Sequence, residues 1–342
     1  MGINLTPIVV KRISGLEDFT GRSFAVDAST YLYQFLALIR MPDGKPLTDS
    51  EGNVTSHLVG LIFRTTRLML DYKMRLAFVF DGRPPELKMV EIERRRKTKK
   101  KASEEWKKAL TEGDYATAFS KAVMTSRMTK SMVDDAKRLL QLLGIPYVQA
   151  PSEAEAQAAF MAASGDVWAT TSKDYDSLLF GTPRLVRFLT LTGKEYLPSK
   201  RVSRPLEPEL IILQRFLGKH GITREQLIDL AILVGTDFNL GIKGIGPKTA
   251  LKLVKTHGKL EDMPSDIKAK LSANYQTIRQ LYLAPNIVEN YEIGYGELQE
   301  EEIYSFLCEE RNFSPTRVQT AVKRMKQYYS WTKQNDLGKW LN

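Results

Sequence analysis

Four apolar segments of this chain lead directly to acidic residues, and this repetition constrains the fold more than any other feature. Each segment has the length and composition of a buried β-strand, and stretches with helical spacing separate the segments. The pairs of segment and acid are Ser23–Val26 with Asp27, Leu76–Phe80 with Asp81, Ile145–Gln149 with Glu153 and Glu155, and Val167–Thr171 with Asp174 and Asp176. The alternation predicts an α/β fold with a central, mostly parallel sheet flanked by helices. Because parallel strands end at a common edge, we expect the six acids to converge there.

Taken alone, the acids fit two interpretations. Asp174 and Asp176 can close a strand in an Asp-rich turn, or they can point to one side of an extended chain and share a cation. Ser152 and Glu155 match a capping box, and Glu153 suits the positive end of a helix, so these two glutamates also have a structural interpretation. The recurrence after four separate strands favours the metal interpretation, because acids placed independently in turns would not converge.

The expected ligands indicate which metal would bind. Carboxylate oxygens favour Mg²⁺ or Mn²⁺, and their number predicts two ions about 4 Å apart, the arrangement that hydrolyses phosphodiesters. The three histidines (His57, His220 and His257) are scattered, which argues against a zinc site, and the single Cys308 excludes an internal disulfide. These features predict an intracellular protein.

The charge balance predicts a polyanionic partner. The chain has 50 Lys and Arg residues against 40 Asp and Glu residues, a formal charge of +10. This excess favours nucleic acid ahead of an anionic membrane. The sequence contains no apolar run of membrane-spanning length and no signal peptide at its start.

A basic stretch interrupts the strand and helix pattern. Residues Lys88–Lys101 include eight Lys or Arg residues and two Glu residues, and helical spacing continues through Trp106. Such a stretch is either a solvated helix face or an inserted basic arm, here at about residues 83–130, that meets phosphates. A second helix at Met128–Leu143 would return the chain to the core.

A glycine-rich segment predicts a second phosphate-binding element at about residues 224–257. A helix at Arg224–Val234 precedes the sequence G-I-K-G-I-G-P-K-T-A-L, which has the signature of a helix-hairpin-helix. Its glycines let the backbone approach a phosphate, and Lys243 and Lys248 supply positive charge. The alternative is an ordinary glycine-containing connection between helices. Asp237 lies just before the hairpin and would be a seventh acid near the site.

Together these motifs resemble the flap endonuclease branch of the structure-specific 5′ nucleases, in its archaeal type. The resemblance is carried by A-V-D-A-S, T-S-H-L, F-V-F-D-G-R-P-P-E-L-K, G-I-P-Y-V-Q-A-P-S-E-A-E-A, K-D-Y-D-S-L-L-F-G and G-I-K-G-I-G-P-K-T-A. It implies a PIN-like 5′ nuclease fold with a helical arch and a helix-hairpin-helix. The expected organisation is one nuclease domain at 1–326, with an N-terminal part at 1–100 and an internal part at about 145–260, in a chain that is a monomer by itself.

The resemblance also implies an activity. It indicates a metal-dependent endonuclease, with 5′–3′ exonuclease activity, that cuts a 5′ flap at its junction with duplex DNA during Okazaki fragment maturation and DNA repair. The implied ligands of two Mg²⁺ ions, for which Mn²⁺ can substitute, are Asp27, Asp81, Glu153, Glu155, Asp174, Asp176 and Asp237. Lys88 and Arg95 correspond to the basic pair that steadies the scissile phosphate. A 5′ exonuclease, a Holliday junction resolvase and a catalytically silent DNA-binding scaffold are the alternatives.

Further DNA contacts follow from the resemblance alone. Tyr33 would stack on a displaced base, the region around Thr55 would hold a one-nucleotide 3′ flap, and the hairpin would bind duplex DNA with a K⁺ ion. Gly241 stands where some relatives have a serine that helps to hold K⁺. The expected DNA-binding residues are Tyr33, Thr55, Arg64, Arg67, Arg94, Gly235, Lys243, Gly244, Gly246 and Lys248.

The end of the chain resembles a peptide that docks on the sliding clamp PCNA. In an expected tail at 327–342, the sequence Q-N-D-L-G-K-W-L at 334–341 would form a short turn. The expected clamp contacts are Gln334, Leu337, Trp340 and Leu341. Leu341 departs from the second aromatic that is usual there, and burial of these side chains in the core is the alternative. An archaeal member would act in the cytoplasm, at the nucleoid.

Overall fold

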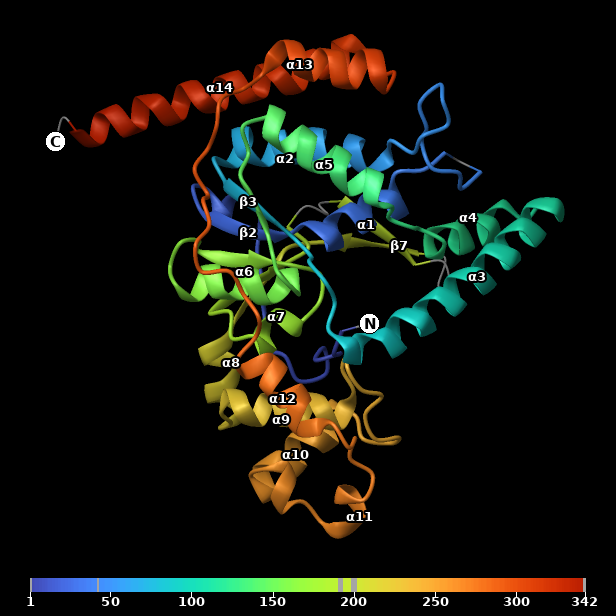
Figure 1. Ribbon diagram of the computed structural model, residues 1–342, viewed down its shortest axis with the longest axis vertical. Coiled ribbons are helices and arrows are strands. Elements are labelled where there is room, and N and C mark those ends of the chain that lie inside the picture. The colour runs from blue at the N-terminus through green and yellow to red at the C-terminus, as the bar shows by residue number, and fades with distance from the viewer. Residues whose placement is uncertain (1, 42, 190–192, 198–201, 341–342) are drawn as a thin grey trace.

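A seven-stranded sheet, in which five neighbouring strands run parallel to one another, forms the centre of the molecule (Figure 1). The computed structural model describes residues 2–41, 43–189, 193–197 and 202–340. In spatial order the strands are β1 (Arg12–Ile13), β9 (Glu209–Ile212), β6 (Arg184–Arg187), β5 (Ala169–Thr171), β2 (Ser23–Asp27), β3 (Arg75–Phe80) and β4 (Tyr147–Gln149). A separate ribbon pairs β7 (Gly193–Leu197) with β8 (Val202–Leu206). The predicted α/β class with a mostly parallel sheet is confirmed.

Helices cover both faces of this sheet (Figure 1). One layer contains α1 (Ala28–Leu38), α2 (Ser56–Tyr72) and α5 (Lys130–Leu142), with α13 (Glu300–Tyr304) and α14 (Pro315–Trp340) outside it. On the other side lie α6 (Ala154–Ala163) and α7 (Asp176–Leu179). Beyond them is a smaller helical group, made of α8 (Leu213–His220), α9 (Arg224–Val234), α10 (Pro247–His257), α11 (Ser265–Lys268) and α12 (Tyr275–Leu283).

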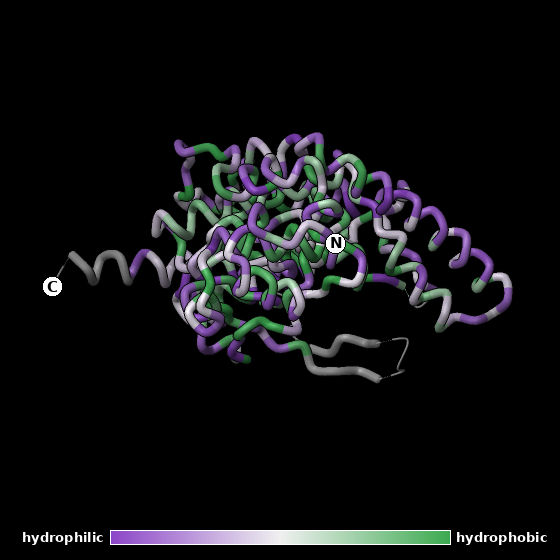
Figure 2. The backbone as a smooth tube through the Cα atoms, turned by 90° about the horizontal axis from the view of Figure 1, so that it is seen from below, coloured by the Kyte–Doolittle hydropathy of each residue, from purple (hydrophilic) through white to green (hydrophobic). Residues whose placement is uncertain are grey.

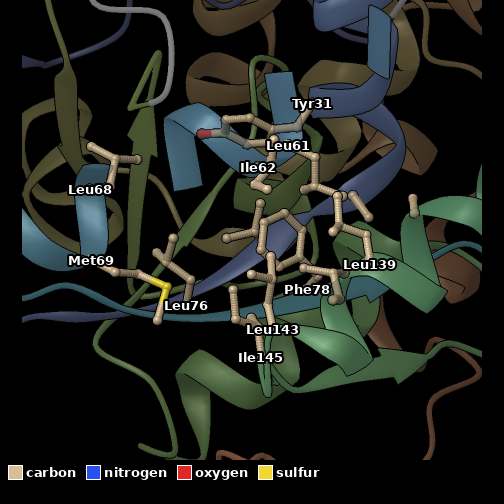
Figure 3. Close-up of a cluster of buried hydrophobic side chains, with 14 of the residues drawn as sticks. Tyr31, Leu61, Ile62, Leu68, Met69, Leu76, Phe78, Leu139, Leu143 and Ile145 are labelled. Carbon is tan, nitrogen blue, oxygen red and sulfur yellow. The ribbon is translucent and has the colours of Figure 1, made fainter. Parts of the chain in front are cut away.

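Residues of the central strands alternate between the two helical layers, as the pleat requires. In β3, Leu76 and Phe78 belong to the large core formed with α1, α2 and α5 (Figure 3). Ala77 and Val79 face the opposite way and pack in a cluster with the alanine-rich α6. Apolar residues on both faces explain why the strands read as continuous apolar runs. The sheet is therefore buried, and only its edges remain for polar groups.

A helical hairpin projects from the sheet as a basic arm, formed by α3 (Met89–Thr111) and α4 (Tyr115–Met124). Buried alanines hold its two helices together, namely Ala102, Ala109, Ala118 and Ala122. The remainder of α3 is mostly polar and extends away from the body (Figure 2). The arm lies within the expected range of 83–130.

The C-terminal segment differs from the expectation. Helix α14 continues from Pro315 to Trp340, so it crosses residues 326 and 327 without a break and leaves no short turn at 334–340. Tyr328 is buried against the main core, which explains why the helix continues past the expected start of a tail. Leu341 lies outside the described residues, as do the side chains of Leu337 and Trp340. Within the described chain, every helix is too short or too polar to span a bilayer.

Contact between α1 and α2 requires a glycine at position 60. A β-carbon added to Gly60 would overlap the ring of Phe35. We expect Gly60→Ala to lower the free energy of unfolding by about 1–3 kcal/mol, because a packed core resists added volume. Chemical denaturation of the purified variant would measure this change.

Gly218→Ala is the matched control, because Gly218 is also helical but has no neighbour within 4 Å of an added β-carbon. This variant should gain up to about 1 kcal/mol from the higher helix propensity of alanine. Equal effects of the two substitutions would contradict the assigned α1–α2 contact.

Candidate functional site

All seven predicted acids gather at the edge where the parallel strands end. Asp27 is the last residue of β2, and Asp81 directly follows β3. The other five come from three segments, with Glu153 and Glu155 at the start of α6, Asp174 and Asp176 after β5, and Asp237 after α9. Their charges act on one another as a single connected group, because Asp27 interacts with Asp81 and Asp174, Glu155 with Asp27 and Asp176, Asp176 with Asp237, and Glu153 with Asp81.

Burial makes this group of carboxylates electrostatically unfavourable. Asp27 and Asp176 are each only 5% exposed. Burial, together with the negative charge of Asp81, raises the pKa of Asp27 to about 7. Burial and the charge of Asp237 raise the pKa of Asp176 to about 7, and the pKa of Glu155 is also raised by burial and by Asp176. At neutral pH Asp27 and Asp176 are therefore only partly ionised, and a cation at this site would favour their ionised form.

Two cations at the base of the arm contact the acids. The Lys88 ammonium forms an ion pair with Glu153 and lies 3.5 Å from an Asp237 carboxylate oxygen. The Arg95 guanidinium donates to Asp237 at 2.5 Å and to Glu91 at 2.8 Å. Burial alone would lower the pKa of Lys88, but the charge of Glu153 raises it. Both side chains are thus charged and are held directly beside the acids.

The donor set fits a hard divalent cation. Its oxygen ligands are those that Mg²⁺ prefers, and the raised pKa values mean that a cation would gain by replacing protons. Within the described chain, no three acidic, histidine or cysteine side chains are placed so that they could hold a metal ion as they stand. Lys88 and Arg95 now pair with Glu153 and Asp237, so these two acids become available to a metal only when the cations move.

Asp81 has a structural partner that the sequence did not reveal. Its carboxylate accepts the backbone N–H of Ala154 at 2.8 Å and so caps α6 from the neighbouring strand. The predicted capping box of Ser152 and Glu155 is therefore wrong, because Glu153 occupies the N-cap position and makes no side-chain capping bond. Glu155 instead accepts a hydrogen bond from Ser172 at 2.9 Å and points into the acid group.

The N-terminal residues reach the acids from far away in the sequence. The backbone N–H of Ile3 donates to Asp176 at 2.9 Å, and a β-carbon on Gly2 would lie 2.6 Å from an Asp176 carboxylate oxygen. Only glycine fits at position 2 without displacing Asp176. Sequence reasoning missed this contact, because no local pattern links residues 173 positions apart.

The side chains near the arm that are predicted to contact DNA differ in their exposure and in their partners. Tyr33 is 37% exposed, and the Lys99 ammonium lies 4.7 Å from the centre of its ring. Thr55 is only 4% exposed, so its side chain is not available for the predicted DNA contact. The guanidinium of Arg64 lies over the Phe35 ring at 5.6 Å. Arg67 pairs with Asp71, and Arg94 pairs with Glu91.

The hairpin between α9 and α10 has the predicted position and shape. Lys243, Gly244, Gly246 and Lys248 are all exposed along it. Gly246 is the N-cap of α10, and Pro247 follows at the first helical position, so no side chain caps the N–H groups at this helix end. Gly235 has a positive φ of 111°, which ends α9 and turns the chain. This element is suited to contact phosphates.

The raised pKa values predict how stability depends on pH when metal is absent. Asp176 titrates near 3.8 in the unfolded chain but at about 7 in the fold, so the folded state binds more protons between these values. The free energy of unfolding therefore falls as pH rises through this window. In EDTA, Asp176→Asn should become more stable relative to wild type as the pH rises from about 4 to about 7, by on the order of 1 kcal/mol or more. Denaturation at several pH values measures this difference.

Asp49→Asn is a control whose stability relative to wild type should change with pH in the opposite direction. Burial would raise the pKa of Asp49, but hydrogen bonds from Asn53 lower it, so its contribution to stability is lost as pH falls. This variant should therefore be destabilised mainly above the unfolded pKa. Added Mg²⁺ should raise the melting temperature of wild type more than that of Asp176→Asn. A parallel pH response of the two variants would refute the electrostatic assignment.

Comparison with known proteins reveals relatives of similar length. Residues 1–102 match the XPG N-terminal domain, and residues 144–237 match the XPG I-region. Flap endonuclease 1 of Pyrococcus horikoshii is 45% identical over 342 residues, which cover 100% of this chain and 98% of that protein. The solved structure of flap endonuclease-1 from Methanococcus jannaschii is 38% identical with a TM-score of 0.77, and the match covers 97% of this chain and 100% of that chain.

A more distant structure shares the fold. The catalytic core of Rad2 in complex with a DNA substrate is 22% identical, with a TM-score of 0.69 and coverage of 92% of this chain and 96% of that chain. The archaeal relatives carry the assignment of family, because their similarity spans the arm, the acid edge and the hairpin together. The chain therefore belongs to the flap endonuclease family of XPG-type nucleases.

Proposed function

We propose that this protein cleaves a DNA 5′ flap at its junction with duplex DNA, and that it also removes nucleotides as a 5′–3′ exonuclease. Nucleases of its family depend on divalent metal ions. The single observation that carries the proposal is the convergence of seven acids beside Lys88 and Arg95 at the base of a basic arm. Such an enzyme would act in Okazaki fragment maturation and DNA repair, in the cytoplasm at the nucleoid.

The acids would hold two Mg²⁺ ions, or Mn²⁺ in their place. When bound, the ions would supply an activated water and stabilise charge on the departing 3′ oxygen. Asp27, Glu155 and Asp176 would release their protons as the ions arrive. Lys88 and Arg95 would exchange Glu153 and Asp237 for the scissile phosphate, adding positive charge where it develops. The two side chains thus neutralise acids in the resting protein and contact substrate in the active one.

The remaining surfaces would orient a branched DNA substrate. Lys243 and Lys248 on the hairpin would grip the duplex through its phosphates, with a K⁺ ion bound to loop carbonyls. Tyr33, beside the arm, would stack on a base near the junction. The exposed loop before α2, rather than the buried Thr55 side chain, would receive a 3′ flap. The solved structure of the Rad2 catalytic core supports the proposal that this protein binds DNA, because that core shares the fold and is in complex with a DNA substrate.

We also propose that residues 334–341 dock on the sliding clamp PCNA. The supporting observation is the sequence Q-N-D-L-G-K-W-L, of which the residues up to Trp340 end α14. Docking would extend the reach of a monomeric enzyme to replicating DNA, by raising its local concentration there.

A carboxylate that holds metal should be needed for cleavage and not for DNA binding. Asp174 is only half-buried, and no hydrogen bond to its carboxylate is seen within the described residues, so its removal should leave the fold intact. We expect Asp174→Ala to bind a 5′-flap substrate normally but to lower kcat at least about a hundredfold. Cleavage assays with flap, nicked and four-way substrates in Mg²⁺, with the cut mapped to the nucleotide, would measure it.

Asp71→Ala is the matched control, since Asp71 pairs with Arg67 on the exposed side of α2. It should retain wild-type turnover. Near-normal cleavage by Asp174→Ala would refute the assignment of Asp174 as a metal ligand. If the wild-type protein preferred to cut the four-way junction, the protein would be a Holliday junction resolvase and not a flap endonuclease.

Lys88 should affect metal binding and turnover in opposite directions. It competes with metal for Glu153 and Asp237, so Lys88→Met should lower the Mg²⁺ concentration needed for half-maximal activity. The same substitution should lower kcat about tenfold or more, because it removes positive charge at the phosphate. Mg²⁺ titrations of single-turnover cleavage separate the two effects. A variant that needs more Mg²⁺ than wild type would contradict this role.

A further inference from the structure

A recess of about 1200 Å³ lies at the edge of the sheet opposite the acids. It is lined by Gly21, just before β2, and by Arg75, the first residue of β3, whereas the acids follow the last residues of these strands. The length of β3 places the two edges about 20 Å apart. The end of α14 also borders the recess and lies on the side of the molecule away from the arm (Figures 1 and 2).

The recess is positively charged. Its cations are Lys73, Arg75, Lys326 and Lys333. Glu297 is the one acid among the described residues that line the recess. Among the side chains that the structure describes, only Lys326 of these four has an acid partner, which is Glu300. The recess therefore presents positive charge that is not neutralised from within the described chain.

Fixed aromatic side chains form much of its wall. The Tyr329 hydroxyl donates to the Leu143 carbonyl at 2.8 Å, and the Tyr295 hydroxyl donates to the Leu76 carbonyl at 2.9 Å. The Lys73 ammonium lies 5.3 Å from the centre of the Trp331 ring. These contacts hold the wall in place, so a ligand would enter a preformed site and lose little affinity to ordering it.

The position of the recess identifies the class of partner. It faces away from the acid edge, the arm and the hairpin, which are the surfaces that DNA would follow. Lys333 lines the recess, and the next residue, Gln334, begins the proposed clamp-docking peptide. A protein held by residues 334–341 would therefore lie beside the recess.

We propose that the recess binds an acidic segment of that same protein, as a second contact beside the docking peptide. The inference rests on the clamp docking given under the proposed function. Charge complementarity is its basis, because unneutralised cations beside a docking peptide favour acidic side chains on the partner and speed association. The second contact would orient the enzyme on its partner, because two contacts fix a relative orientation that a single peptide contact leaves open.

The test compares binding of the full-length chain to the sliding clamp of the same organism by titration calorimetry. Arg75 is exposed at the start of β3, so Arg75→Glu should leave folding unchanged and weaken clamp binding about fivefold or more, with a flatter dependence on salt. Arg75→Gln should give a smaller loss. Lys323→Glu makes the same charge change on an exposed part of α14 outside the recess and should bind like wild type. Equal melting temperatures would establish that all variants are folded.

Two further measurements separate this inference from the proposal about the docking peptide. Trp340→Ala and a synthetic peptide of residues 327–342 test the peptide without relying on the recess. Wild-type affinity of Arg75→Glu, with loss in Trp340→Ala, would overturn the recess proposal and leave clamp docking in place. Failure of the synthetic peptide to bind, with no effect of Trp340→Ala, would overturn both. Weaker binding of Arg75→Glu to flap DNA without clamp would assign the recess to nucleic acid instead.

Discussion

Repulsion among buried carboxylates is the constraint on which the arrangement of this protein depends. The residues that follow parallel strands lie at one edge of the sheet, and here acids follow or end four of these strands. Burial removes the water that would otherwise screen the charges, so the pKa values of Asp27 and Asp176 rise to about 7. Such a site persists only if protons, basic side chains or metal ions neutralise it.

The basic arm meets this requirement through its first turns. Lys88 and Arg95 contact Glu153 and Asp237, and Glu91 holds Arg95 from within the same helix. The same contacts place positive charge beside the acids, where a phosphate would lie. The arm thus neutralises the acids through these ion pairs, and under the proposed function the same two cations would contact the substrate.

Much of the architecture was accessible from local sequence patterns. The alternation of apolar strands with helices predicted the parallel sheet, because the period of buried residues directly reflects strand and helix geometry. The glycines around Lys243 predicted the hairpin, since few residues tolerate its backbone angles. Convergence of the acids followed from topology, because their position after each strand is a property of the sequence.

Tertiary structure decided what these local patterns did not contain. Asp81, and not Ser152, caps α6, because β3 and β4 are neighbours in the sheet. Helix α14 continues beyond residue 326, because Tyr328 finds a buried place on the distant core. The sequence by itself determined the type of fold and the edge where the acids gather. Only folding decided which atoms neutralise the acids, cap α6 and pack against Asp176. These contacts join residues that are far apart in the sequence, so no local sequence pattern reveals them.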